Sequence, residues 1–168
     1  MLPIDIRHGT REDAALITDF IRRMVTEMAF YGGHAVNGAP DVWAAMVERV
    51  RAQSVRTEHL YLLASHGALT RTTVGMAAAY LEPLENIFVA KTRLHLSAVY
   101  TVPSARRQGA ARALIHQVLA WGRQMHAGEA DLNVLVANPA HRLYEHLGFQ
   151  MHEMSMVKTL GHDQRAGP

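Results

Sequence analysis

The chain has 168 residues, of which 49% are hydrophobic and 19% are charged. This length and composition predict one globular domain with a sizeable core and exclude a disordered chain. The formal net charge of +2 is too small to indicate nucleic-acid binding by itself. The absence of cysteine excludes disulfides and cysteine-ligated metals, and the 11 histidines lack the paired spacing of a metal site, so we expect them at the surface.

The first half of the chain predicts a strand, then two helices, then two strands. Thr10 with Asp13 three residues later is typical of a capped helix start, and apolar residues then recur at helical spacing as far as Met28. The turn-rich stretch 31–40 separates this helix from a second one. Strands are expected at residues 4–7, 59–64 and 73–81.

The second half predicts three more strands and two more helices. Strands are expected at residues 94–102, 131–136 and 149–158, and a long helix at residues 110–126. Asn138 and Pro139 suit the first positions of a last helix, and Gly148 suits its end. The element order is therefore β-α-α-β-β-β-α-β-α-β, within one domain at residues 1–160 followed by a tail at 161–168.

The junction between residues 94–102 and the helix after it is typical of a phosphate-binding site. Pro103 ends the strand, and a short basic loop with Gly109 leads into the helix. Such a junction directs free backbone N–H groups and the positive end of a helix dipole to one place. Small residues at 109–111 allow a ligand to approach the backbone, and arginines add positive charge.

The same loop resembles the acetyl-CoA loop of the GNAT superfamily of N-acetyltransferases, Arg/Gln-x-x-Gly-x-Gly/Ala. Here the pattern is filled by Arg106, Gly109 and Ala111, with alanine in place of the commoner second glycine. A second segment, 132–149, resembles the family's later motif, with matches at Asn138, Leu143, Tyr144, Gly148 and Phe149. Because both motifs occur in the family's order and separation, the chain is identified as a member.

The resemblance covers roughly residues 4–158 and implies an α/β (α+β) GNAT fold. This fold has a central mixed, mostly antiparallel sheet of six to seven strands flanked by about four helices. It also implies acetyl-CoA as cosubstrate and no metal. The residues implied to bind the cofactor lie on the strand, the loop and the start of the last helix: Tyr100, Thr101, Val102, Arg106, Arg107, Gln108, Gly109, Ala110, Ala111, Arg112 and Asn138.

The resemblance also implies that the hydroxyl of Tyr144 protonates the departing CoA thiolate, although a tyrosine at this helical position also suits a core. The general base is left open. Several family members carry glutamate where this chain has Asn133. A water chain, or one of the glutamates Glu27, Glu82 and Glu85, remains a candidate.

The acceptor pocket of this fold is shaped by the loop between the first two helices and by the loop before the last strand. Those regions hold Tyr31, His34 and Trp43 on one side and His152, Glu153 and Met154 on the other. The acceptor amine could belong to an amino acid, a drug or a protein N-terminus. Transfer of acyl groups other than acetyl is equally open.

The function expected from the residues and the resemblance together is acetyl transfer from acetyl-CoA to a primary amine in a ternary complex. The alternatives are an inactive GNAT-fold module that binds CoA or a protein partner, and a nucleotide-binding regulator. No signal-peptide pattern and no long apolar run is present, so we expect a soluble cytoplasmic protein that binds neither nucleic acid nor membrane. Many members of the family are dimers, but no sequence feature identifies an interface, so a homodimer stays open.

Overall fold

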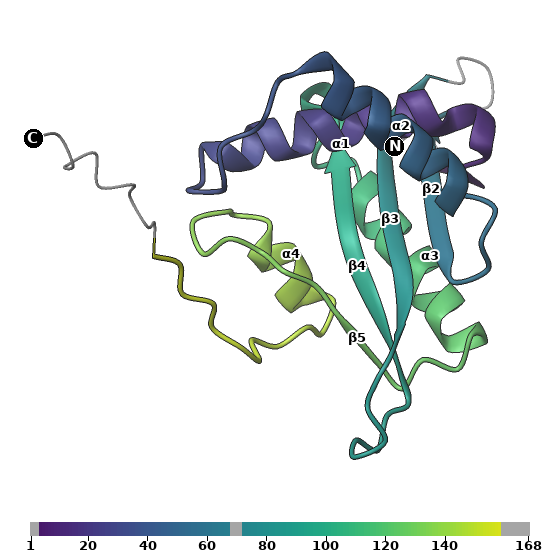
Figure 1. The fold of residues 1–168 in the computed structure, drawn as a ribbon, viewed down its shortest axis with the longest axis vertical. Coiled ribbons are helices and arrows are strands. Elements are labelled where there is room, and N and C mark those ends of the chain that lie inside the picture. Colours follow the sequence, from purple (N-terminus) through teal and green to yellow (C-terminus); the bar gives the residue numbers. More distant parts are fainter. Residues whose placement is uncertain (1–3, 68–71, 159–168) are drawn as a thin grey trace, which may run out of the picture.

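The computed structural model describes residues 4–67 and 72–158, which build one open sheet with helices on both faces (Figure 1). The strands lie in the order β1-β2-β3-β4-β5. They are β1 (Ile4–His8), β2 (His59–His66), β3 (Thr73–Pro83), β4 (Thr92–Thr101) and β5 (Glu129–Asp131). Neighbouring strands are antiparallel except β4 and β5, which are parallel. The helices are α1 (Ala14–Ala29), α2 (Pro40–Gln53), α3 (Ala110–Gln124) and α4 (His141–His146).

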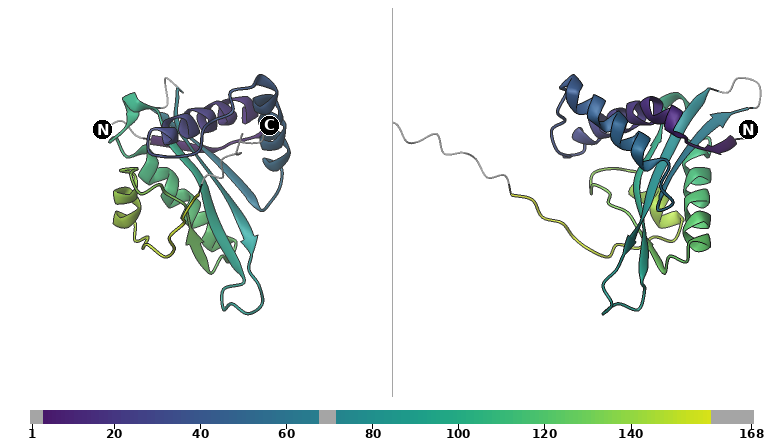
Figure 2. Two further views of the ribbon diagram at one scale, coloured as in Figure 1. Left: turned by 60° about the vertical axis from the view of Figure 1, so that its left-hand side comes forward. Right: turned by 45° about the vertical axis from the view of Figure 1, so that its right-hand side comes forward.

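Helices cover the two faces of the sheet unequally. The right-hand view of Figure 2 shows α3 on one face and α1 with α2 on the other. Helix α3 packs closely because Gly122 faces β4, where an added Cβ would lie 2.6 Å from Leu94 Cδ2. Helices α1 and α2 cross only one end of their face in Figure 1, so the other end of that face is left without a helix above it.

The alternation of side chains along the strands divides the core into two parts. The part under α3 contains Leu62, Leu94, Leu96, Leu114 and Ile115, among others. The part under α1 and α2 contains Ile17, Phe20, Leu63, Met76 and Tyr100, among others.

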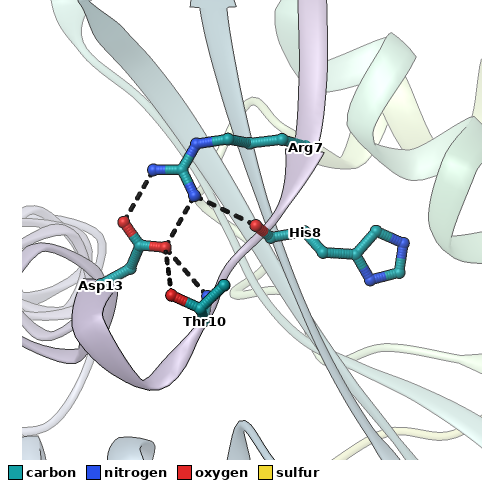
Figure 3. Close-up of polar contacts among 4 residues, drawn as sticks. All are labelled: Arg7, His8, Thr10 and Asp13. Carbon is teal, nitrogen blue, oxygen red and sulfur yellow. Dashed lines mark hydrogen bonds and ion pairs between the residues drawn. The ribbon is translucent and has the colours of Figure 1, made fainter.

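A polar cluster fixes the turn from β1 into α1 (Figure 3). The Arg7 guanidinium donates two hydrogen bonds of 2.7 Å to the Asp13 carboxylate, which also accepts the backbone N–H of Thr10 at 2.9 Å. The Arg7 hydrogen bonds lower the pKa of Asp13 to about 2, against a smaller opposing effect of burial. The capping residues predicted from sequence, Thr10 and Asp13, are confirmed, with a short 3-10 turn at Arg11–Asp13 before the α-helix.

The predicted fold class is confirmed, but two predicted strands are wrong. The described residues contain five strands instead of six to seven. The strand expected at 131–136 is instead β5, which ends at Asp131. No strand forms over 149–158, where alternating apolar residues such as Met154 and Met156 are exposed and pair with no neighbouring strand. Residues 159–168, which include the expected tail, lie outside the described residues.

Within the described residues, no helix is long and apolar enough to cross a membrane.

Candidate active site

Strand β4 has an open edge that begins where β5 ends. The parallel pairing of β4 with β5 covers only Arg93, Leu94 and His95 of β4. Beyond this point β4 continues to Thr101 with β3 on one side and, among the described residues, no strand on the other. The register of β3 and β4 also shifts between Ala78 and Ala79, and such a bulge bends a strand and redirects its groups. A free stretch of backbone therefore lies between β4 and the segment that follows β5.

Along β4, successive residues turn their backbone N–H and C=O groups alternately toward β3 and away from it. This alternation determines which backbone groups face the open edge. Val102 N–H donates to Val74 O at 2.8 Å, and antiparallel pairing then turns the backbone groups of Tyr100 toward β3 as well. The same alternation turns the N–H groups of Val99 and Thr101 away from β3. Consistent with this, Thr101 O accepts a 3.0 Å hydrogen bond from Arg106 Nε, outside the sheet.

The loop from β4 to α3 gathers unpaired backbone donors. Arg107 has φ +62° and Gly109 has φ +92°, so the backbone turns twice through the left-handed region. The first backbone bond of α3 runs from Ala113 N–H to Gly109 O. In the described part of the chain, the N–H groups of residues 107–112 have no acceptor. They and the start of α3 form a cradle of positive partial charge.

The arginines of this loop fall into two groups. Arg106 is tied down: its Nη2 lies 2.6 Å from Glu27 Oε2 at the end of α1, and its guanidinium carbon lies 5.8 Å from the Tyr100 ring centroid. Arg107 and Arg112 are exposed and make no ion pair among the described residues. Arg106 thus anchors the loop, and the other two arginines are available to a ligand.

The remaining loop residues support this arrangement. Gln108 donates from its amide to Ser104 O at 3.1 Å, which closes the turn. Ala110 is buried and Ala111 half-buried, so their small side chains pack under the loop and leave its outer surface to backbone. A Cβ added at Gly109 would meet only Ile4 Cδ1, at 3.6 Å. The positive φ, and not a lack of space, therefore favours glycine at this position.

The segment after β5 turns back into α4 through Asn138. Its side-chain oxygen accepts the backbone N–H of Ala140 at 2.9 Å, and its backbone oxygen accepts from His141 N at 3.3 Å. The helix therefore begins at His141, later than Asn138 and Pro139 predicted. The side-chain amide nitrogen of Asn138 has no partner among the described residues.

Helix α4 ends in a Schellman motif that also places Tyr144. Phe149 N–H donates to Tyr144 O and Gly148 N–H to Glu145 O, both at 3.0 Å, with Gly148 at φ +90°. The rings of Tyr144 and Phe149 meet edge to face at 6.0 Å. The predicted stop at Gly148 is confirmed, and the motif explains why tyrosine, glycine and phenylalanine occur at this spacing.

Tyr144 packs against the core under α3, and its burial raises the pKa of the phenol. The hydroxyl has no hydrogen-bond partner among the described residues. A half-buried phenol with a raised pKa is protonated at neutral pH, which suits a proton donor.

The candidate base residues lie in different surroundings. Glu27 is held by Arg106, and Glu82 accepts a 2.9 Å bond from Arg93. Glu85 lies on the exposed β3–β4 turn and forms no side-chain ion pair among the described residues. Asn133 is exposed and lies beyond the end of β5 rather than on a strand.

One polar pair at the site was not foreseen from the sequence. His95 Nδ1 lies 2.7 Å from Asp131 Oδ1, where β4 and β5 part. The expectation that the histidines are surface residues is therefore wrong at His95, whose side chain is 16% exposed. A histidine and an aspartate 36 residues apart carry no local spacing signal, so only the strand register could have indicated the pair.

The residues expected to shape the acceptor pocket lie on two segments, the α1–α2 loop and the extended segment after α4. The α1–α2 loop approaches the segment after β5, since a Cβ at Gly33 would lie 3.3 Å from Leu135 Cδ1. Trp43 Nε1 donates to Asn37 O at 2.9 Å and holds this loop to α2. Tyr31 is half-buried and His34 exposed. On the other side, His152, Glu153 and Met154 are exposed in the extended segment after α4.

No group of three or more potential metal ligands is present among the residues that the structure covers.

Comparisons with known proteins find one matching family and several structures of similar fold. The model of the acetyltransferase (GNAT) family matches residues 33–149. The fold is similar to that of aminoglycoside N-acetyltransferase AAC(6')-Iy in complex with CoA, with TM-score 0.72 and 18% identity over 95% of this chain and 96% of that chain. It is also similar to a "predicted acetyltransferase with acetyl-CoA" from Clostridium acetobutylicum, with TM-score 0.75 and 12% identity over 94% of this chain and 96% of that one.

A third structure of the same fold is a transcriptional regulator from Bacillus halodurans C-125, with TM-score 0.73 and 18% identity over 94% of this chain and all of that one. At such identities the likeness shows the fold alone. A comparison of the sequence with curated proteins finds no significant match.

Proposed function

Because the chain belongs to the acetyltransferase (GNAT) family, we propose that it transfers the acetyl group of acetyl-CoA to a primary amine of a small molecule or peptide. The observation that carries the proposal is the open edge of β4, which leads directly into a loop with unpaired N–H groups. An extended pantetheine arm needs backbone partners along its length, and a pyrophosphate needs a concentration of donors at its end. This site offers both in the required order.

The β4–α3 loop would hold the pyrophosphate. Its N–H groups, from Arg107 to Arg112, have no acceptor in the described chain and would bond to phosphate oxygens, with the positive end of the α3 dipole beside them. The exposed side chains of Arg107 and Arg112 would add charge-assisted bonds to phosphate oxygens. Arg106 would support the site without contacting the phosphates, because its bonds to Thr101 and Glu27 hold the loop in shape.

The pantetheine arm would lie along β4 as an added strand. The N–H groups of Val99 and Thr101 face the open edge and are the donors available to its amides. The backbone groups of Tyr100 and Val102 bond to β3. These residues would hold β4 in place and would not hydrogen-bond to the pantetheine arm. The free side-chain amide of Asn138 would approach the arm from the opposite side.

Tyr144 would supply the proton that the thiolate takes up. A CoA thiol has a pKa of about 8.5, so the thiolate is a moderate leaving group that benefits from an acid close by. Burial keeps the Tyr144 phenol protonated, and nothing in the described chain competes for its proton. The amine would attack the thioester directly, since the chain has no cysteine to carry an acyl group.

Calorimetric titration with acetyl-CoA, with ADP as control, tests this proposal. We expect micromolar binding of acetyl-CoA and much weaker binding of ADP, which lacks the pantetheine arm. Turnover is then measured on a panel of primary amines by release of CoA thiol. Failure to bind either nucleotide would overturn the proposal, and binding without turnover of any amine would favour the inactive CoA-binding module.

A matched pair of glycine variants tests the loop itself. Gly109→Glu adds a carboxylate to the loop that would hold the pyrophosphate and strains its positive φ, so it should abolish acetyl-CoA binding. Gly32→Glu introduces the same side chain at a similar positive φ, +86°, in open space on the α1–α2 loop. It should keep acetyl-CoA affinity within about twofold, since it costs the same backbone strain away from the loop. Normal affinity in Gly109→Glu would remove the loop from the binding site.

A further inference from the structure

The His95–Asp131 pair lies at the vertex of the opening between β4 and β5. The two residues are register partners, and Asp131 is the last residue of β5. The pair is therefore adjacent to Leu96, the first residue of β4 beyond its pairing with β5, and to the bulge that follows it. If acetyl-CoA lies along the open edge of β4, this vertex is the inner end of its path.

The hydrogen bond determines which nitrogen of His95 carries the proton. The Asp131 carboxylate is an acceptor, so Nδ1 donates to Oδ1 across 2.7 Å. Arg93 Nη1 lies 3.4 Å from the other carboxylate oxygen and forms an ion pair with it. In the neutral ring the lone pair is then on Nε2. Nε2 has no partner among the described residues and is not among the buried unpaired atoms, so it reaches solvent.

The ring of His95 is also fixed in place by an aromatic neighbour. Its centroid lies 5.0 Å from that of Tyr80 on β3, and Tyr80 in turn lies 5.8 Å from His59 on β2. His95 is therefore oriented by a carboxylate at one nitrogen and by packing on its face. In many enzymes the base that activates the nucleophile is likewise oriented by a third group.

His95 and Tyr144 lie on opposite faces of the sheet. Leu94 and Leu96, the neighbours of His95 on β4, belong to the core under α3, so His95 points to the α1–α2 face. Tyr144 packs on the α3 side. A thioester held at the open edge of β4 would thus have a proton acceptor on one side and a proton donor on the other.

We propose that His95 is the general base of the acetyl transfer and that Asp131 positions it, an inference that rests on the proposed function. Nε2 accepts one proton from the ammonium group of the acceptor, directly or through a water, and passes it to solvent. The neutral amine forms the new C–N bond, and the C–S bond breaks as the tetrahedral intermediate collapses. Tyr144 protonates the thiolate and regains, through solvent, the second amine proton. The products are the amide, the CoA thiol and one free proton.

The glutamates considered from sequence are less suited to this role. Glu27 and Glu82 are each held in an ion pair by an arginine, so their carboxylates are already engaged and are not free to contact an acceptor amine. Glu85 lies in the exposed turn between β3 and β4, with no group that orients it among the described residues.

The test uses three variants of the intact chain with a shared binding control. His95→Gln should lower kcat about 10²-fold with the amine that the wild type acetylates best. Asp131→Asn should lower kcat about 10-fold, since it acts through His95. His59→Gln, in the same aromatic row but in no ion pair within the described part of the chain, should leave kcat unchanged. Acetyl-CoA affinity, measured by calorimetry, should stay the same in all three.

Two further readouts separate catalysis from structure. For His95→Ala, added imidazole should restore part of the lost turnover. The kcat/KM of the wild type should fall toward acid pH, and this fall should disappear in His95→Gln. Tyr80 and Asp131 contact the ring of His95, while His59, Arg93 and Glu82 lie beyond these two residues, so Asp131→Asn serves as the check that the fall belongs to His95.

A third readout needs no acceptor. Nitrogen-15 NMR of the neutral ring should show the proton on Nδ1 of His95 in the wild type, and a shift of the proton toward Nε2 in Asp131→Asn.

The outcomes are distinct. Turnover of His95→Gln equal to that of an active wild type would overturn the inference and leave the proposed function intact. Loss of acetyl-CoA binding in His95→Gln in parallel with turnover would also overturn it, since the role would then be structural. A wild type that binds acetyl-CoA but acetylates no amine would overturn both the proposed function and the inference.

Discussion

Tyr144 is the residue on which the chemical proposal depends most directly. Burial raises its pKa, and its hydroxyl is free to donate among the described residues. We expect Tyr144→Phe to keep acetyl-CoA affinity and to lower kcat about 10²-fold, because only the departing thiolate loses its proton donor. Tyr61→Phe is the control, since the Tyr61 hydroxyl bonds Gln53 at 2.8 Å, away from the site. Steady-state kinetics with saturating acetyl-CoA measure this effect. Unchanged turnover in Tyr144→Phe would contradict a catalytic role for Tyr144.

Asp13 is a single residue whose effect on stability depends on pH. Arg7 lowers its pKa to about 2, below the value in the unfolded chain. The stabilisation is therefore fully present above about pH 4 and is lost as pH falls toward 2. We expect Asp13→Asn to lower the free energy of unfolding by about 1–2 kcal/mol at pH 7, a range reduced because Arg7 is half exposed.

Urea unfolding at pH 7 and pH 2.5 measures this difference. The gap between the wild type and Asp13→Asn should shrink at the lower pH, where the wild-type carboxyl also becomes protonated. Asp5→Asn on the same strand is the control, because Asp5 has no ion pair among the described residues and should change stability little at either pH. A gap that stays constant with pH would contradict the ion-pair explanation.

At the scale of elements, the end of α4 controls where Tyr144 lies. Gly148 has φ +90° with open space around it, so alanine there costs backbone strain alone, about 1 kcal/mol. We expect Gly148→Ala to lower the melting temperature by about 2–4 °C and kcat severalfold, through loosening of the helix end. Gly38→Ala is the matched control, since Gly38 has equal space and no positive φ. Equal melting temperatures for the two variants would contradict the Schellman assignment.

The elements also show what the sequence could and could not predict. Helices α1 and α3 were predictable because capping and 3.6-residue periodicity are local signals. The loop at Gly109 and the stop at Gly148 were predictable because only certain residues adopt positive φ easily. Strand pairing is not local: residues 149–158 alternate like a strand, yet in the part of the chain that the structure describes no strand pairs with them. The His95–Asp131 pair was missed for the same reason, since it depends on the register of β4 against β5.

At the scale of the whole molecule, the proposed ligand would bridge parts of the fold that few contacts now join. The open edge of β4, the loop before α3 and the segment after β5 surround the same opening, but backbone pairing between β4 and β5 ends at His95. A ligand that bonds along this edge adds the missing neighbour strand. Its binding energy is then stabilisation of the whole folded state, because the unfolded chain has no such site.

This coupling gives a prediction for the intact protein. At acetyl-CoA concentrations about 100-fold above the dissociation constant, the stabilisation is about 2.7 kcal/mol, which raises the melting temperature by about 5–10 °C. Hydrogen exchange should slow most at the amides of Val99 and Thr101 and in the loop 107–112, and little in β1 and β2. ADP should protect the loop without the strand, because it lacks the pantetheine arm. Protection by acetyl-CoA confined to α1 and α2, with no change along β4, would place the ligand elsewhere on the molecule.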